Sequence, residues 1–116
     1  MSEIATIQKQ LKIKSGSAQR YEKEVGLYQK EVHDLQKKLD KFVSDGADSE
    51  DWDIKNTKRM MEESNKMILD TKTRLGKVNG ELSDLVKQVE GKPGVADTEE
   101  FKNAQQILKK AESSPS

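Results

Sequence analysis

Apolar residues recur along the first 43 positions with the 3,4 spacing that places them on one face of a helix. Two series of positions, each counted in sevens, carry this pattern. They are Ile4, Leu11, Ala18, Val25, Val32 and Leu39, and Ile7, Lys14, Tyr21, Tyr28, Leu35 and Phe42. All of these residues except Lys14 are apolar or aromatic. The pattern predicts a helix over residues 3–43 that buries one narrow stripe.

Gly16, between Ser15 and Ser17, raises the alternative of a loop inside this segment. The two series keep their phase from Leu11 to Ala18, and a loop would give no reason for that. The helix is therefore expected to continue through Gly16, at a cost of roughly 1 kcal/mol relative to alanine. The alternative is that the first turns fray as far as Ser17.

A second pattern predicts a helix over residues 52–90. Its main series is Ile54, Met61, Ile68, Leu75, Leu82 and Val89, and its companion series is Thr57, Ser64, Thr71, Val78 and Leu85. The acidic stretch before it contains Gly46, which favours a chain reversal. Asp51 and Asp53 suit the first turn because the helix dipole favours negative charge there. The stretch "GKPG" predicts the end of the helix, with Gly91 as cap and Pro93 as breaker.

A third helix is expected over residues 98–112. Asp97 followed by Glu100 resembles a capping box. Its apolar series is expected to be Phe101, Ala104, Leu108 and Ala111.

Together these patterns predict an all-α fold: an elongated antiparallel three-helix bundle, or rod, in a single domain over residues 1–116. The short turn between the first two helices is expected to set Tyr28 near Ile68 and Leu11 near Leu85. Leu85, like Val78, is large where the third helix should cover it. The small polar residues of the companion series fall where only two helices pack; they are Thr57, Ser64 and Thr71.

Composition narrows the classes of function. Charged residues make up 36% of the chain, hydrophobic residues 32%, and the formal net charge is zero. This suits long helices with one buried stripe, and no global charge favours nucleic acid or an anionic membrane. The absence of cysteine excludes thiol catalysis and suits a reducing compartment. No signal peptide or membrane span is recognisable, so we expect a soluble intracellular protein.

Candidate chemistry is sparse, and we expect no enzyme, cofactor or metal site. His33 follows a position of the buried stripe and is expected to point to solvent, without a second histidine or cysteine. Lys14 is expected to extend its ammonium group out of the stripe, or else to determine helix register or partner choice. Met60 and Met67 are either core filler or an adaptable protein-binding face in the two-helix half.

Four stretches resemble the tubulin-binding cofactor A family. They are "LKIKSGSAQRYEKEVGLYQKEV", "DWDIKNTK", "EESNKMILD" and "EEFKNAQQIL", and they occur in the family's order over nearly the whole chain. No single motif is specific, but the ordered set is. Two departures concern the third stretch. Leu69 stands where the family usually has proline, and Lys66 stands where methionine is common.

The resemblance implies a cytoplasmic, cytoskeleton-associated three-helix protein that captures β-tubulin after its release from the chaperonin and hands it on for heterodimer assembly. Other tubulin-folding cofactors would be further partners, and family members are monomers or homodimers. Basic residues that match the family would suit the acidic surface of tubulin, and an apolar strip would anchor it. The expected partner-binding residues are Lys12, Lys14, Arg20, Lys23, Tyr28, Met60 and Met67.

Two other classes compete with this interpretation. A structural coiled-coil spacer or adaptor would have a uniformly charged outer face, whereas Met60 and Met67 are expected to be exposed. A prefoldin-type subunit needs β-hairpins between its helices. Residues 43–52 lack the alternating β-branched residues that would form them.

Overall fold

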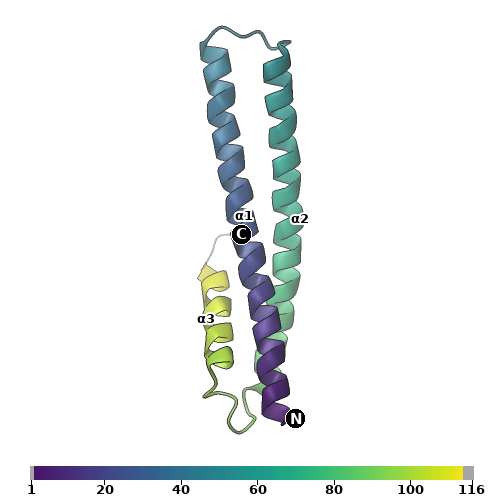
Figure 1. Ribbon diagram of the computed structural model, residues 1–116, viewed down its shortest axis with the longest axis vertical. Helices are drawn as coiled ribbons and strands as arrows, with labels where there is room; N and C mark the ends of the chain where they lie inside the picture. The colour runs from purple at the N-terminus through teal and green to yellow at the C-terminus, as the bar shows by residue number, and fades with distance from the viewer. Residues whose placement is uncertain (1, 114–116) are drawn as a thin grey trace. The chain divides into compact units, whose positions relative to one another are not determined.

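The computed structural model describes residues 2–113, and every regular element within that range is an α-helix. Helix α1 spans Glu3–Ser44, α2 spans Trp52–Val89 and α3 spans Glu99–Ser113 (Figure 1). Each bound lies within one residue of the range predicted from the heptad pattern. The described residues contain no strand, and the all-α fold class is confirmed.

Helix α1 runs through Gly16 without interruption. It begins beside Ser2, whose hydroxyl oxygen accepts a hydrogen bond from the backbone N–H of Ala5 at 3.1 Å. Such a bond satisfies one of the unpaired donors of the first turn. Gly16 lies inside the helix, 13 residues after its first residue, Glu3. No atom lies close to the position where a Cβ of residue 16 would be. The continuous helix is therefore confirmed, and the alternative of fraying to Ser17 is wrong.

The chain forms two compact units, of which the first joins Met1–Glu22 to Thr73–Ser116. All three helices and the α2–α3 connection contribute to its apolar core. The buried members are Ile7, Leu11, Ala18, Leu82, Leu85, Val86, Val89, Val95, Phe101, Ala104 and Ile107. Leu11 and Leu85 lie in this one cluster, as the antiparallel arrangement predicted. Val78 is half-buried against it, so the large residues of the companion series do meet a third helix.

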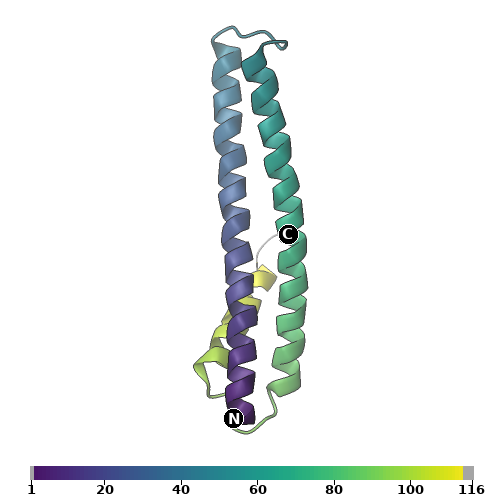
Figure 2. The same cartoon turned by 45° about the vertical axis from the view of Figure 1, so that its right-hand side comes forward.

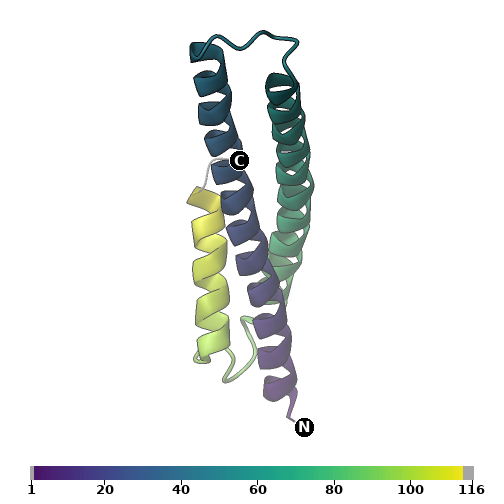
Figure 3. The same ribbon diagram turned by 45° about the horizontal axis from the view of Figure 1, so that its top comes forward.

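Helix α3 lies beside the N-terminal part of α1 in this unit (Figures 1 and 3), and polar side chains also join the two helices. Gln8 donates a hydrogen bond to the carboxylate of Glu100 at 3.2 Å. Lys110 lies 3.2 Å from the carboxylate of Glu22. Gln8 and Glu22 are two heptads apart, so α3 follows one face of α1.

The second unit, Lys23–Lys72, is an antiparallel pair of helical segments from α1 and α2 (Figure 2). Its buried side chains include three aliphatic residues, Val25, Leu35 and Ile54, and three small hydroxyl residues, Thr57, Ser64 and Thr71. Thr57 donates its hydroxyl to the carbonyl oxygen of Asp53 at 2.7 Å, so its buried polar group is satisfied within the helix. Two helices with small side chains in the interface bury less apolar surface than three.

The turn between α1 and α2 follows from Gly46, which has a φ of 92°. The N–H of Gly46 bonds the carbonyl of Val43 at 3.0 Å, and the N–H of Ala47 bonds that of Phe42 at 3.0 Å. This pair of bonds is the Schellman motif, which needs a left-handed residue and therefore favours glycine. Asp51 then caps α2, because its carboxylate accepts the N–H of Asp53 at 2.9 Å. The predicted reversal at Gly46 is confirmed.

The connection from α2 to α3 differs from the prediction. Gly91 was expected to cap α2, but among the described glycines only Gly46 and Gly94 have positive φ. The left-handed residue is Gly94, at a φ of 83°. The chain turns there and inserts Val95, which is 1% exposed, into the three-helix core. We attribute the choice of Gly94 for the turn to the burial of Val95. Val95 belongs to none of the heptad series, so the sequence pattern did not predict its burial.

The start and the face of α3 also need correction. Asp97 was expected to form a capping box with Glu100, but the cap is Thr98, whose hydroxyl accepts the N–H of Phe101 at 3.2 Å. Glu100 instead accepts the hydrogen bond from Gln8 of α1. The most buried face of α3 includes Ile107, which the predicted series omitted, whereas the predicted Leu108 and Ala111 are half-buried.

Candidate partner-binding surfaces

Lys14 is the one charged residue in the heptad stripe of α1, and its ammonium group forms an ion pair within the first unit. Its Nζ lies 2.9 Å from Oε2 of Glu81 on α2. About a third of the Lys14 side chain remains exposed. The lysine therefore extends out of the stripe as expected and joins α1 to α2, while its role in setting helix register stays a prediction. Its ammonium group is less available to a partner than an unpaired lysine would be.

The pair alters the acidity of Glu81. The hydrogen bond from Lys14, and then the attraction of its charge, lower the pKa of the Glu81 carboxyl. Partial desolvation opposes this shift, and the charge of Lys77 adds to it weakly. Because the ionised form is favoured in the folded chain, the pair stabilises the first unit while Glu81 is charged.

The other predicted basic residues are exposed. Lys12 and Arg20 belong to the first unit and Lys23 to the second. The guanidinium carbon of Arg20 lies 5.0 Å from the centre of the Tyr21 ring, within the range of a cation–π contact. This contact orients Arg20 while leaving its N–H donors facing solvent. Lys12 and Arg20 are therefore the predicted basic residues of the first unit that can best meet an acidic surface.

The predicted apolar residues lie in the second unit and differ in exposure. Met67 is 41% exposed, whereas Met60 and Tyr28 are half-buried. The side-chain amide of Asn56 approaches the sulfur of Met60 at 3.7 Å. Met60 and Met67 share a heptad position beside the buried stripe of α2, so both stand at the flank of the helix pair. Of these three predicted residues, Met67 offers the largest exposed fraction to solvent.

Several exposed apolar residues were not among the predicted binding residues. Within the second unit they are Leu27, Val43, Trp52 and Leu69, with exposures of 59%, 60%, 71% and 68%. Ile13, in the first unit, is 58% exposed. All five lie outside the two heptad series of their helices. Counting the large apolar residues left over by those series would have identified them from the sequence.

The described residues offer little to catalysis or to metal binding. His33 is exposed, as expected. No cluster of three or more histidine or acidic side chains within residues 2–113 is arranged to hold a metal ion. None of the described helices combines the length and apolar character needed to cross a membrane. The described surface does present exposed basic side chains and exposed apolar side chains.

Comparison with known proteins gives a consistent result. The sequence model of the family described as "Tubulin binding cofactor A" matches residues 6–108. The chain is 33% identical over 100 residues to the proteins named "Tubulin-specific chaperone A" from Gallus gallus and from Homo sapiens. Each alignment covers 86% of this chain and 88% of the relative.

Two solved structures share the fold. The structure titled "human tubulin chaperone cofactor a" has a TM-score of 0.73 and 31% identity, and the match covers 91% of this chain and 98% of that one. The tubulin folding cofactor A of Arabidopsis thaliana has a TM-score of 0.83 and 26% identity, with coverage of 95% and 99%. Each match therefore extends over nearly the whole of both chains.

Proposed function

The chain belongs to the tubulin binding cofactor A family, and we propose on this basis that it is a tubulin-folding chaperone that captures β-tubulin after its release from the chaperonin. The observation that carries the proposal is the family match over residues 6–108. The chain would hold β-tubulin until the heterodimer is assembled, and other tubulin-folding cofactors would receive it. We place this activity in the cytoplasm, where a chain without cysteine suits the reducing conditions.

The chemistry of the surface supports a binding role based on contacts alone. Exposed basic side chains at Lys12, Arg20 and Lys23 would steer an acidic partner surface and fix its orientation. Long-range attraction of this kind raises the association rate and weakens as salt is added. Lys14 would contribute less than its neighbours, because Glu81 already engages its ammonium group.

Apolar residues of the second unit would supply the contacts that hold the complex. Met67, with its flexible thioether side chain, adapts to irregular partner surfaces. Trp52 and Leu69 are more exposed than Met67 and lie on the same helix. Aromatic and large apolar side chains that become desolvated at an interface commonly dominate its binding energy. We therefore add Trp52 and Leu69 as candidate anchors and assign Met60 and Tyr28 a supporting role. Leu69 would engage a different part of the partner from Met67, because residues two apart in a helix do not share a face.

The proposal is tested by binding of the purified chain to immobilised β-tubulin, with immobilised α-tubulin as the matched surface. Wild-type chain should bind β-tubulin more tightly than α-tubulin. Replacing Met67 by aspartate should speed dissociation about tenfold or more, because a charge would be buried against an apolar contact. Glu62→Gln, a change at an exposed position of the same helix, serves as the control and should leave dissociation unchanged.

Circular dichroism would confirm that each variant keeps its helix content. If folded wild-type chain binds neither tubulin, the chaperone proposal is wrong and a structural spacer or adaptor takes its place. If it binds both tubulins equally, the assignment of β-tubulin is wrong. If M67D binds like wild type, the complex is held elsewhere.

A further inference from the structure

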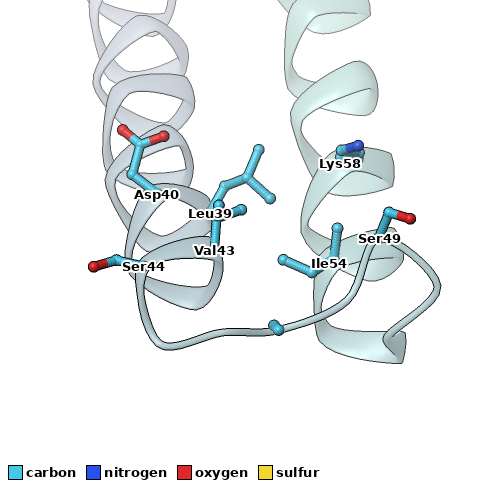
Figure 4. A pocket seen from close by; sticks show the side chains of 8 residues that line it. Leu39, Asp40, Val43, Ser44, Ser49, Ile54 and Lys58 are labelled. Carbon is cyan, nitrogen blue, oxygen red and sulfur yellow. The ribbon is translucent and has the colours of Figure 1, made fainter.

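An open groove of about 500 Å³ lies at the α1–α2 turn of the second unit (Figure 4). Its lining residues are Leu39, Asp40, Val43, Ser44, Ala47, Ser49, Ile54 and Lys58. Leu39 and Val43 of α1 and Ile54 of α2 point toward the space between the helices, whereas Ser44 points away (Figure 4). The surface of the groove is therefore mainly apolar, with Asp40, Ser49 and Lys58 as polar members of its lining.

The exposed part of this apolar lining is not needed to build the turn. A Schellman motif is commonly accompanied by an apolar contact between the residue after the glycine and one in the last helical turn. Ala47 and Phe42 occupy those places, and both are half-buried. Val43 is 60% exposed on the wall of the groove, outside both the cap contact and the heptad stripe.

Acidic residues outnumber basic ones in the segment that forms the turn beside the groove. Residues 40–58 contain six acidic and three basic side chains. One of the three basic residues, Lys55, is engaged by Glu50 at 2.6 Å. Lys58 is the one basic residue in the lining, and Asp40 stands in the opposite wall. Asp40 and Lys58 balance each other in the lining, but the turn segment as a whole is negative, so a partner segment with positive charge would gain electrostatic attraction at the turn.

We propose that this groove binds a protein segment in which an apolar side chain is flanked by lysine or arginine residues. The apolar side chain enters between Leu39, Val43 and Ile54, and the flanking cations lie against the acidic turn. This partner differs in charge from the acidic surface that Lys12 and Arg20 fit. The groove is therefore a second binding site, whose existence does not depend on tubulin binding.

The test uses isotope-labelled full-length chain and a defined probe, the blocked peptide Lys-Lys-Leu-Phe-Lys-Lys. Titration followed by NMR should shift the backbone amides of Val43, Ala47 and Ile54 in a saturable way. Two matched peptides separate the contributions to affinity. Serine in place of the two apolar residues should abolish saturation, and glutamate in place of the lysines should weaken binding at least tenfold.

Variants of the chain locate the site. Val43→Ser should weaken binding of the probe about fivefold, the effect of removing one partly buried apolar contact. Leu27→Ser is the matched control, since Leu27 is 59% exposed in the same unit but does not line the groove. Asp45→Asn, which removes an acidic charge beside Gly46, should weaken binding and reduce its dependence on salt.

The proposal is overturned if the probe leaves the groove amides unshifted at millimolar concentration, or if the serine peptide binds as well as the probe. It is also overturned if the glutamate peptide binds as tightly as the probe, since the acidic turn would then have no preference for positively charged segments. Equal losses of probe affinity in V43S and L27S would also overturn the proposal, because the probe would then contact exposed apolar residues in general and not the groove. Retained tubulin binding by V43S, with loss of the probe, would show that the two sites are separate.

Discussion

Lys14 of α1 and Glu81 of α2 are joined by an ion pair of 2.9 Å, although 67 residues separate them in the sequence. The lysine occupies a position of the heptad stripe, where its neighbours one turn away are apolar. One charged group in such a stripe favours the register in which it finds its partner and disfavours shifted registers that leave it against apolar surface. The pair is thus compatible with one register of α1 against α2, in addition to the apolar contacts of the core.

The first prediction concerns the pH dependence of stability through Glu81. Its pKa is lower in the folded chain than in the unfolded chain, because Lys14 stabilises the carboxylate. The pair's contribution is therefore full above the unfolded pKa, about 4.3, and is lost as the pH falls through the folded pKa. Urea unfolding at pH 7 and pH 3 should show a smaller loss of stability in Glu81→Gln than in wild type.

Lys14→Gln provides the control for this prediction. With the lysine removed, Glu81→Gln should change the pH dependence little further, because the interaction is already absent. An undiminished effect of E81Q in the K14Q chain would show that another group lowers the pKa of Glu81.

The second prediction concerns the three-helix core. Leu82 is fully buried among residues from all three helices of the first unit, so Leu82→Ala should lower the free energy of unfolding by ~2–5 kcal/mol. Ser64→Ala, at a small polar position of the two-helix unit, should cost far less. Leu27→Ala, at an exposed position, should stay within about 0.5 kcal/mol of wild type. Chemical denaturation measures all three, and equal losses would contradict the assigned layers.

The third prediction compares two buried hydroxyl groups. Ser15 and Thr57 are each 2% exposed, but the Ser15 hydroxyl has no hydrogen-bond partner, whereas Thr57 donates to the carbonyl of Asp53. Ser15→Ala should raise stability by up to ~1 kcal/mol, because an unsatisfied buried polar group is removed. Thr57→Val should lower it by ~0.5–1.5 kcal/mol through the lost bond. Thermal unfolding should show a higher melting temperature for S15A and a lower one for T57V than for wild type. A destabilised S15A would refute the distinction.

The fourth prediction contrasts two glycines. Gly94 has a φ of 83°, and a Cβ there would lie 3.0 Å from Cδ1 of Ile4. Gly94→Ala should therefore lower stability by more than ~1 kcal/mol and expose Val95. Gly16 lies within α1 with open space around it, so Gly16→Ala should raise stability by ~0.5–1 kcal/mol. Differential scanning calorimetry of the two variants should give melting temperatures on opposite sides of wild type.

The fifth prediction concerns the association rate with β-tubulin. Lys12→Glu with Arg20→Glu should slow association and reduce its dependence on ionic strength, with a small effect on dissociation. Both residues are exposed, so the variant should keep its helix content. Lys14 is left intact, because its removal would also break the pair with Glu81. Kinetics at two salt concentrations provide the measurement, and an unchanged association rate would exclude Lys12 and Arg20 from the binding surface.

The sequence by itself determined the helices. In both α1 and α2 the main heptad series has six positions spaced seven residues apart, and a local pattern of this length leaves little alternative to a helix. The same periodicity predicted that α1 continues through Gly16. Gly46 was recognisable as a turn because the left-handed conformation that closes the α1 helix needs a residue without a Cβ. The basic residues named as binding candidates came from a resemblance of motifs, and their role stays a prediction.

Only the tertiary structure decided the features in which residues distant in the sequence compete for the same space or partner. Glu100 was available both to a local capping box and to Gln8 of α1, and the contact with α1 prevailed. Gly94, not Gly91, adopts the left-handed turn because Val95 must reach the core formed by all three helices. Likewise, Lys14 could be assigned to Glu81, and Val43 to the wall of a groove, only once α1 and α2 were paired. Local periodicity selects which face of a helix is buried, but the choice among partners depends on packing between helices.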